Sequence, residues 1–350
     1  MKKGIRLAVL IIAAAMMLSV ASCKKEEKKA EEKKLLASMA TDVGGLGDKS
    51  FNDGANQGLE LVKEKLGADV KVVESKQQTD YVPNLIGLAE DGSDIVFAVG
   101  FLMEQAVKEA AKNNPDTKFA GIDIWAGDGD PSNFMGILYK EHESGYLAGV
   151  VAGMMTKEYA SASPKFNDKN VVGVVLGMFI PPVEKFEVGF IQGVKSVNPD
   201  CKVLSVTTGS FVDQAKGKEA ALAMIEQGAD IVFQVAGLTG LGVIQACKEK
   251  GVAAIGVDVD QSAVAPDTVL TSAVKQIPRT VYLAVEAVKN NTFTGGTKVY
   301  GIEDDATGIS PFHEFESVVP QAVKDKVAQV TADMKAGKIK IETTRAALGM

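Results

Sequence analysis

The sequence has few of the residues that hold metal ions or carry nucleophilic catalysis. Its 350 residues include only two histidines, three cysteines and one tryptophan. Neither His142 nor His313 has partners at the spacing of a metal-ligand set, and no Ser, His and Asp combination suggests a catalytic triad. We therefore expect no metal, no cofactor and no catalytic residues.

Long apolar runs are also scarce. The run from Leu7 to Ala21 follows three basic residues, is too short to span a bilayer comfortably and ends in small residues before Cys23. This order is that of a bacterial lipoprotein signal. We expect a signal peptide over residues 1–22 and a lipid-modified Cys23 that anchors the mature chain to a lipid bilayer. An ordinary secretory signal with a chance cysteine is the alternative.

Clusters of basic residues are absent from the part of the chain that can fold. Residues 24–34 are almost entirely Lys and Glu, so residues 23–34 are expected to form a solvated, lipidated tether. Acidic residues outnumber basic ones by 45 to 38, which argues against nucleic acid as a partner. An extracytoplasmic location would allow a disulfide between Cys201 and Cys247, but we expect both to be unpaired core residues.

The body of the chain contains an internal repeat. Residues 92–97 (GSDIVF) recur at 228–233 (GADIVF), and Gly121-Ile122-Asp123 recurs as Gly256-Val257-Asp258, at offsets of 136 and 135 residues. The same shift places Phe51 on Phe186 and Lys140 on Lys275. The chain is therefore a duplication of one structural unit.

Each copy alternates β-rich runs with helical stretches of period 3.6, which predicts parallel sheets with right-handed crossovers. The expected strands are residues 35–40, 70–74, 95–99, 118–123 and 134–138 in the first copy, and 171–177, 202–206, 231–235, 253–258 and 269–274 in the second. The predicted fold class is α/β, with two doubly wound parallel-sheet lobes joined by a hinge and a ligand cleft between them.

The chain is expected to change lobe after the fifth strand of each copy, and several parallel crossings make a hinge. Lobe 1 then comprises residues 35–140 and 277–350, and lobe 2 comprises residues 141–276. The tail from Lys298 onward, with an amphipathic stretch over 318–334, is expected to cover lobe 1.

The stretch from Asp42 to Asn52 predicts a loop between a strand and a helix. Ser50 is expected to cap that helix, with Asp53 completing something close to a capping box, which places Phe51 and Asn52 at the start of the helix. Ligands of open α/β sheets bind at the carboxyl ends of strands. The residues that end or follow strands, and so should line the cleft, are Asp42, Asp123, Gly177, Gly237 and Asp258.

Carboxylates on both cleft walls accept hydrogen bonds from hydroxyl and N–H groups and disfavour phosphate. Phenylalanines near helix starts offer faces on which a flat heterocycle can stack. A base with a ribose fits this combination and a nucleotide does not. For Phe186 and Phe211, an ordinary place in the core remains the alternative.

Several motifs of the sequence resemble those of the basic membrane protein family. These are Asp42-x-Gly44-x-x-Gly47-Asp48-Lys49-Ser50-Phe51-Asn52, Pro181-Pro182-Val183-x-x-Phe186-x-x-Gly189-Phe190-x-x-Gly193, Gly209-Ser210-Phe211-x-Asp213, and Asp258 with Lys275. The resemblance covers nearly the whole mature chain. It implies the type I periplasmic binding protein fold, service to an ABC transporter, and likeness to purine nucleoside receptor lipoproteins of spirochaetes.

The resemblance also implies roles for individual residues. Phe51 and Phe211 would sandwich the base from opposite lobes, and Phe186 would pack against the base or the sugar. The remaining ligand contacts implied are Asn52, Asp42 and Asp123 at the base edge, and Asp258, Lys275 and the backbone near Gly237 at the ribose. Carboxylates at the base edge favour a purine with N1–H, as in guanosine and inosine, over adenosine. The resemblance leaves open whether Trp125 reaches the ligand.

We therefore expect a lipid-anchored, extracytoplasmic receptor that binds a purine nucleoside, delivers it to an ABC transporter permease and performs no chemistry. One alternative is a sugar or another small polar ligand, such as a signalling furanose, on the same scaffold. A nucleoside hydrolase or phosphorylase is a second alternative. The sequence shows neither the calcium-binding aspartate cluster that the hydrolase would need nor the basic phosphate pocket that the phosphorylase would need. An adhesin or antigen that uses the fold only as a scaffold is the third.

Overall fold

The computed structural model describes residues 34–350, of which residues 35–350 form one compact unit. The predicted signal peptide, Cys23 and nearly all of the tether lie outside the described residues. Among residues 34–350, no helix has both the length and the apolar character needed to cross a membrane.

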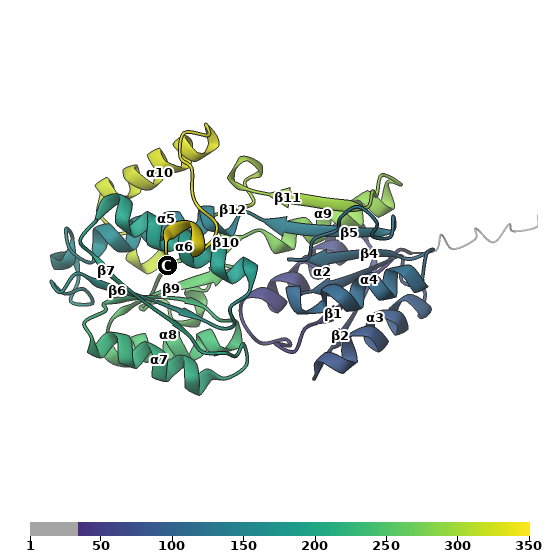
Figure 1. The fold of residues 1–350 in the computed structure, drawn as a ribbon, viewed down its shortest axis with the longest axis horizontal. Helices are drawn as coiled ribbons and strands as arrows, with labels where there is room; N and C mark the ends of the chain where they lie inside the picture. The colour runs from purple at the N-terminus through teal and green to yellow at the C-terminus, as the bar shows by residue number, and fades with distance from the viewer. Residues whose placement is uncertain (1–33) are drawn as a thin grey trace, which may run out of the picture. The chain divides into compact units, whose positions relative to one another are not determined.

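Two six-stranded sheets organise this unit, one in each lobe (Figure 1). The lobe 1 sheet is entirely parallel and has the order β11-β5-β4-β3-β1-β2. Its strands are β1 (Leu36–Thr41), β2 (Asp69–Glu74), β3 (Ile95–Val99), β4 (Lys118–Ile122), β5 (Phe134–Tyr139) and β11 (Gly296–Tyr300).

The lobe 2 sheet has the order β12-β10-β9-β8-β6-β7, with only β12 antiparallel to its neighbour. Its strands are β6 (Val171–Leu176), β7 (Lys202–Thr207), β8 (Ile231–Val235), β9 (Ala253–Asp258), β10 (Val269–Lys275) and β12 (Thr307–Ile309). The first five strands of each lobe therefore pair in the same relative order, as a duplicated unit should. The predicted α/β class with two parallel-sheet lobes is confirmed.

Helices cover both faces of each sheet, which explains why the central strands are buried on both faces and mostly apolar. In lobe 1, α2 (Phe51–Leu66) and α9 (Ile277–Lys289) cover one face, and α3 (Tyr81–Glu90) and α4 (Glu104–Asn113) cover the other. The side chains of β3 alternate accordingly, because Ile95, Phe97 and Val99 join the first cluster and Val96 joins the second.

Lobe 2 repeats this layering. α5 (Glu141–Met155) and α6 (Pro181–Val197) cover one face of its sheet, and α7 (Gln214–Glu226) and α8 (Leu238–Lys250) cover the other. Cys201 and Cys247 are buried free thiols that belong to the clusters on these opposite faces, so each is a separate core residue.

The position of the C-terminal tail differs from the prediction. The chain passes from β5 to α5 and from β10 to α9, and it returns to lobe 2 between β11 and β12. There β12 pairs with β10, and α10 (Gln321–Lys335) packs against α5. The prediction that the tail beyond β11 covers lobe 1 was wrong, because Phe312, Phe315 and Val323 complete the apolar cluster of lobe 2.

Helices α5 and α6 approach so closely that their contact requires glycine. A Cβ atom on Gly149 of α5 would lie 2.2 Å from the carbonyl oxygen of Phe190, and one on Gly193 of α6 would lie 2.0 Å from the carbonyl oxygen of Tyr146. Real Cβ atoms do not occur at such distances from backbone oxygens. These glycines therefore let α6, which carries Phe186, pack directly against α5, the helix that follows the first crossing between the lobes.

Replacing Gly149 with alanine is expected to lower the free energy of unfolding by about 1 to 3 kcal/mol, because the helices must move apart to admit the methyl group. Denaturant unfolding monitored by circular dichroism measures this change. Gly87 in the interior of α3 is the matched control, because its Cβ would meet no atom within 4 Å. Gly87→Ala should leave the stability unchanged or raise it, and an equal loss in both variants would contradict the packing argument.

Candidate ligand-binding site

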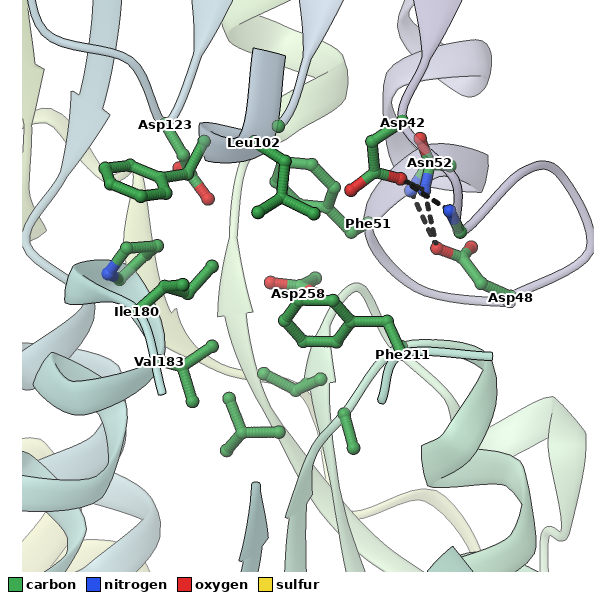
Figure 2. Close-up of a pocket in the computed structure, with 18 of the residues that line it drawn as sticks. Asp42, Asp48, Phe51, Asn52, Leu102, Asp123, Ile180, Val183, Phe211 and Asp258 are labelled. Atoms are coloured by element: carbon green, nitrogen blue, oxygen red, sulfur yellow. Dashed lines mark hydrogen bonds between the residues drawn. The ribbon is translucent and has the colours of Figure 1, made fainter. Parts of the chain in front are cut away.

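A pocket lies between the two lobes and is bordered by residues from both. Together with its open mouth it has a volume of about 590 Å³, within the range of small-molecule sites. The nine residues predicted as ligand contacts all border it, namely Asp42, Phe51, Asn52 and Asp123 from lobe 1 and Phe186, Phe211, Gly237, Asp258 and Lys275 from lobe 2. In Figure 2, Leu102 and Asp42 reach into the pocket from one lobe, and Val183 and Phe211 reach into it from the other.

Asp48, and not the predicted cap Ser50, organises the loop before α2 (Phe51–Leu66). The Asp48 carboxylate accepts hydrogen bonds from the backbone N–H groups of Ser50 and Asn52 at 2.9 Å and of Asp53 at 3.1 Å. Ser50 makes no side-chain cap, and Asp53 accepts from Gly47 and Lys49 instead. The predicted capping box was therefore wrong, because Asp48 satisfies the free amides at the start of the helix.

Ser50 instead contacts the opposite lobe. Its hydroxyl donates to Asp258 Oδ2 at 2.6 Å, and the side-chain amide of Gln261 donates to the carbonyl of Lys49 at 2.9 Å. These contacts are made beside the pocket, between the loop of lobe 1 and the end of β9 in lobe 2. The two lobes are thus joined by polar contacts in this structure.

Asp123 and Asp258 occupy equivalent places in the two lobes. Asp123 follows β4 and Asp258 ends β9, and both have left-handed backbones, with φ of 62° and 64°. Aspartate tolerates this conformation better than most residues that carry a side chain. The shared turn directs both carboxylates from the sheet edges into the pocket (Figure 2).

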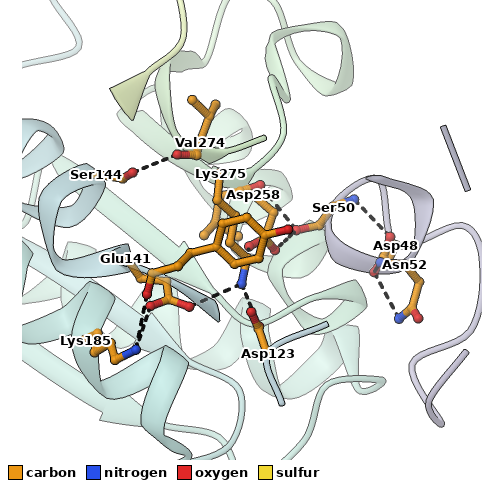
Figure 3. Close-up of polar contacts among 12 residues, drawn as sticks. Asp48, Ser50, Asn52, Asp123, Glu141, Ser144, Lys185, Asp258, Val274 and Lys275 are labelled. Atoms are coloured by element: carbon orange, nitrogen blue, oxygen red, sulfur yellow. Dashed lines mark hydrogen bonds and ion pairs between the residues drawn. The ribbon is translucent and has the colours of Figure 1, made fainter. Parts of the chain in front are cut away.

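Lys275, at the end of β10, lies among three carboxylates (Figure 3). Its Nζ is 2.6 Å from Asp123 Oδ2 in lobe 1 and 3.7 Å from both Asp258 and Glu141. Glu141 is also paired with Lys185 at 3.1 Å. Lys275 is only 2% exposed, so the network shields its ammonium group from water.

Burial acts on the pKa of three groups that border the pocket, Asp258, Asp42 and Lys275. Burial raises the pKa of Asp258 to about 6, although Lys275 and the Ser50 hydroxyl oppose the shift. Burial likewise raises the pKa of Asp42 against the effect of its hydrogen bonds from Asn52 and Gly44. For Lys275, burial alone would lower the pKa, but the surrounding carboxylates outweigh it and raise the pKa above its usual value.

Two buried acceptor atoms at the pocket have no hydrogen-bond partner. The side-chain N–H of Asn52 donates to Asp42 at 3.0 Å, and the Oδ1 of Asn52 accepts no hydrogen bond. Asp123 accepts from Lys275 through Oδ2, and its Oδ1 is likewise unpaired. A buried acceptor without a donor is costly. Because both residues border the pocket, the site is complementary to a ligand with hydrogen-bond donors.

The three predicted phenylalanines differ in their surroundings. Phe51 begins α2 and Phe211 lies on the loop after β7, so they approach the pocket from opposite lobes (Figure 2). Phe186 is buried and packs edge-on against Phe233, with ring centres 6.2 Å apart. Phe186 is therefore a core residue that also borders the pocket. Gly177, which was also expected to line the cleft, does not border the pocket. A Cβ there would lie 2.3 Å from Phe211, so Gly177 makes room for that ring.

Comparison with known protein families shows to which family the chain belongs. Residues 35–344 match the model of the Bmp family, described as ABC transporter substrate-binding protein PnrA-like. The chain belongs to the Bmp family. The basic membrane protein resemblance seen in the sequence is thus confirmed, and so is a solute-binding role, which implies a ligand and a permease partner.

Individual relatives of this Bmp protein cover most of its length. Basic membrane protein A of Borreliella burgdorferi is 34% identical over 75% of each chain. An uncharacterized lipoprotein of Pyrococcus furiosus is 36% identical over 76% of this chain and 68% of its own. An ABC transporter solute-binding protein from Aeropyrum pernix has a similar structure, with a TM-score of 0.80, 27% identity, and coverage of 89% of this chain and 94% of the other.

Other pocket residues of this Bmp protein were not predicted as ligand contacts. Leu102, Ile180 and Val183 add an apolar wall, and Glu141 supports Lys275 from the start of α5. The Pro-Pro-Val motif before Phe186 was the available signal for Val183. Trp125 does not border the pocket; it is 56% exposed and lies beside Lys108. Within residues 34–350, no group of three or more His, Cys, Asp or Glu residues is placed to hold a metal ion.

Proposed function

We propose that this Bmp protein captures a purine nucleoside between its lobes and presents it to the permease of an ABC transporter. Guanosine and inosine are the preferred ligands, with adenosine weaker. The family is one of ABC transporter substrate-binding proteins, and the structural relative from Aeropyrum pernix is a solute-binding protein. In this proposal the nucleoside leaves chemically unchanged.

The observation that carries the proposal is the pair of unpartnered acceptors, Asn52 Oδ1 and Asp123 Oδ1, in a pocket with a phenylalanine on each lobe. A purine that lies between Phe51 and Phe211 presents N–H groups at its edge, and these donors match the unpaired oxygens. A 6-oxopurine carries N1–H, whereas adenine has an acceptor at that position. The acceptors therefore favour guanosine and inosine.

The rest of the pocket supports a nucleoside over a nucleotide. Asp258 and the backbone of Gly237 offer acceptors for ribose hydroxyls, and Lys275 offers a donor. Asp42, Asp48, Asp123 and Asp258 make the lining acidic, and its one lysine is already paired with carboxylates. A phosphate group would meet uncompensated negative charge there.

The proposal places the protein on the outer side of a membrane through lipid on Cys23. The Cys23 signal in the sequence and the lipoprotein named among the relatives support this location. The three chain crossings between the lobes provide the hinge on which they would open for the ligand and close over it.

The bound ligand itself tests the proposal. Protein purified without added nucleoside and then denatured should release a compound with the ultraviolet spectrum and mass of a purine nucleoside. Release of a sugar without purine absorbance would favour the alternative ligand class. Release of free base during incubation with guanosine, lost on adding a chelator, would favour a nucleoside-cleaving enzyme.

Guanosine binding is expected to weaken at acid pH. The ribose hydroxyls donate to ionised Asp258, whose pKa is about 6. Binding selects the ionised carboxylate, so the affinity should be constant above that pKa and fall by up to about tenfold per pH unit below it. Calorimetric titration across this range measures the effect. Asp258→Asn should bind more weakly and lose this pH dependence, whereas an unchanged pH profile in that variant would remove Asp258 from the site.

A further inference from the structure

The C-terminal segment, residues 341–348, lies against α6 of lobe 2, and Figure 1 shows the C-terminus beside that helix. Arg345 donates from Nε and Nη2 to the two carboxylate oxygens of Glu187, each at 2.7 Å. Its backbone N–H donates to Glu184 at 2.7 Å, and its guanidinium lies 4.5 Å from the ring centre of Phe179. One side chain thus contacts both α6 and the turn before it.

The Glu187 carboxylate is fully buried and also accepts from the Ser205 hydroxyl of β7. A forked, two-bond pair between arginine and a carboxylate is among the strongest and most directional side-chain contacts. Arg345 therefore ties the start of α6 to β7 and to the C-terminal segment.

The same turns of α6 form part of the pocket wall. Ile180, Val183 and Phe186 border the pocket, while Glu184 and Glu187 face the C-terminal segment. Along a helix, residues 183 and 186 share one face, and 184 and 187 share the adjacent one. Arg345 thus contacts these turns beside the face that meets the ligand.

We propose that Arg345 is a positioning residue for the lobe 2 wall of the ligand pocket. It fixes the first two turns of α6 so that Ile180, Val183 and Phe186 are in place before the ligand arrives. Without it, ligand binding would have to order this wall, and the affinity would fall. The effect on affinity rests on the proposed nucleoside function.

The segment that carries Arg345 is itself anchored. Glu342 and Gln192 of α6 exchange two hydrogen bonds of 2.9 and 3.0 Å, and Ile339 and Ile341 pack against the outer apolar cluster of lobe 2. Arg345 lies just past residues 35–344, so family membership assigns it no role.

The test uses a double variant, Arg345→Met with Glu187→Gln, because removing Arg345 alone would leave the buried Glu187 carboxylate without its cation and endanger folding. Its dissociation constant for guanosine should rise about tenfold. Hydrogen exchange of ligand-free protein should be faster at the backbone amides of residues 184–187 and unchanged in α8. Arg345→Lys, which keeps the charge but loses the fork, should give an intermediate loss of affinity.

Lys338→Ala is the matched control, because it removes an ion pair of the same tail, with Asp333, that does not touch α6. It should bind guanosine as the wild type does. Faster exchange in the double variant with unchanged affinity for guanosine would reduce Arg345 to a structural role and overturn the proposal. Unchanged exchange in that variant would overturn it as well. If the wild type binds no nucleoside, the proposed function fails, and the exchange result alone decides whether Arg345 positions the wall.

Discussion

Replacing both Phe51 and Phe211 with alanine is expected to weaken guanosine binding by about 2 to 6 kcal/mol, or at least about 30-fold. In the proposed binding mode each ring stacks on one face of the purine, and stacking of a base on an aromatic side chain contributes about 1 to 3 kcal/mol. The two rings come from opposite lobes, so each single variant should lose about half of this free energy. Calorimetric titration measures the affinities.

The matched control for these variants is Trp125→Ala. It removes a larger aromatic side chain that does not border the pocket. It should leave guanosine binding unchanged. Thermal unfolding of all variants separates loss of the site from loss of the fold, because Phe51 also packs against the core of lobe 1. A folded double alanine variant that binds guanosine normally would mean that the ligand does not lie between these rings.

Lys275→Met is expected to lower the free energy of unfolding by about 3 to 5 kcal/mol and to abolish guanosine binding. The change leaves Asp123, Asp258 and Glu141 in a buried site without their shared cation. Burial already raises the pKa of Asp258 and Glu141 against the opposing effect of Lys275, so without Lys275 these two carboxyls bind protons more tightly in the folded state than in the unfolded chain. The loss of stability should therefore be smaller near about pH 5 than at neutral pH.

The internal repeat supplies the control for Lys275. Lys140 is its counterpart in the first copy, but it is partly exposed and paired with Glu303 at the surface. Lys140→Met should cost at most about 1 kcal/mol. Adding Asp123→Asn to Lys275→Met should recover part of the lost stability, because it removes one uncompensated charge. Equal stabilities of the Lys140 and Lys275 variants would contradict the buried network.

The strands could be predicted closely because both faces of each sheet are covered. Apolar runs such as Ile95–Val99 and Ile231–Val235 have the predicted bounds in the structure. The pocket residues could also be placed, because parallel strands bring their carboxyl ends to one edge of the sheet. The positions of Asp123 and Asp258 could be predicted from two observations alone, their place at the end of a strand and their equivalence in the internal repeat.

Contacts between distant parts of the chain could not be predicted. Ser50 carries a good capping group, but its hydroxyl bonds to Asp258, 208 residues away, while Asp48 caps α2. An amphipathic helix in the tail shows that an apolar surface must cover it, but not which lobe provides that surface. The sequence does not show that Glu141 is buried, because a glutamate at the start of a helix is usually exposed and its partner Lys275 is distant along the chain.

The proposed function is tested by a calorimetric titration of residues 24–350, which lack Cys23, against guanosine, guanosine monophosphate and arabinose. Guanosine is expected to bind one to one without turnover, and the nucleotide and the sugar are expected not to bind. Binding of the nucleotide or the sugar in place of guanosine would contradict the proposed function.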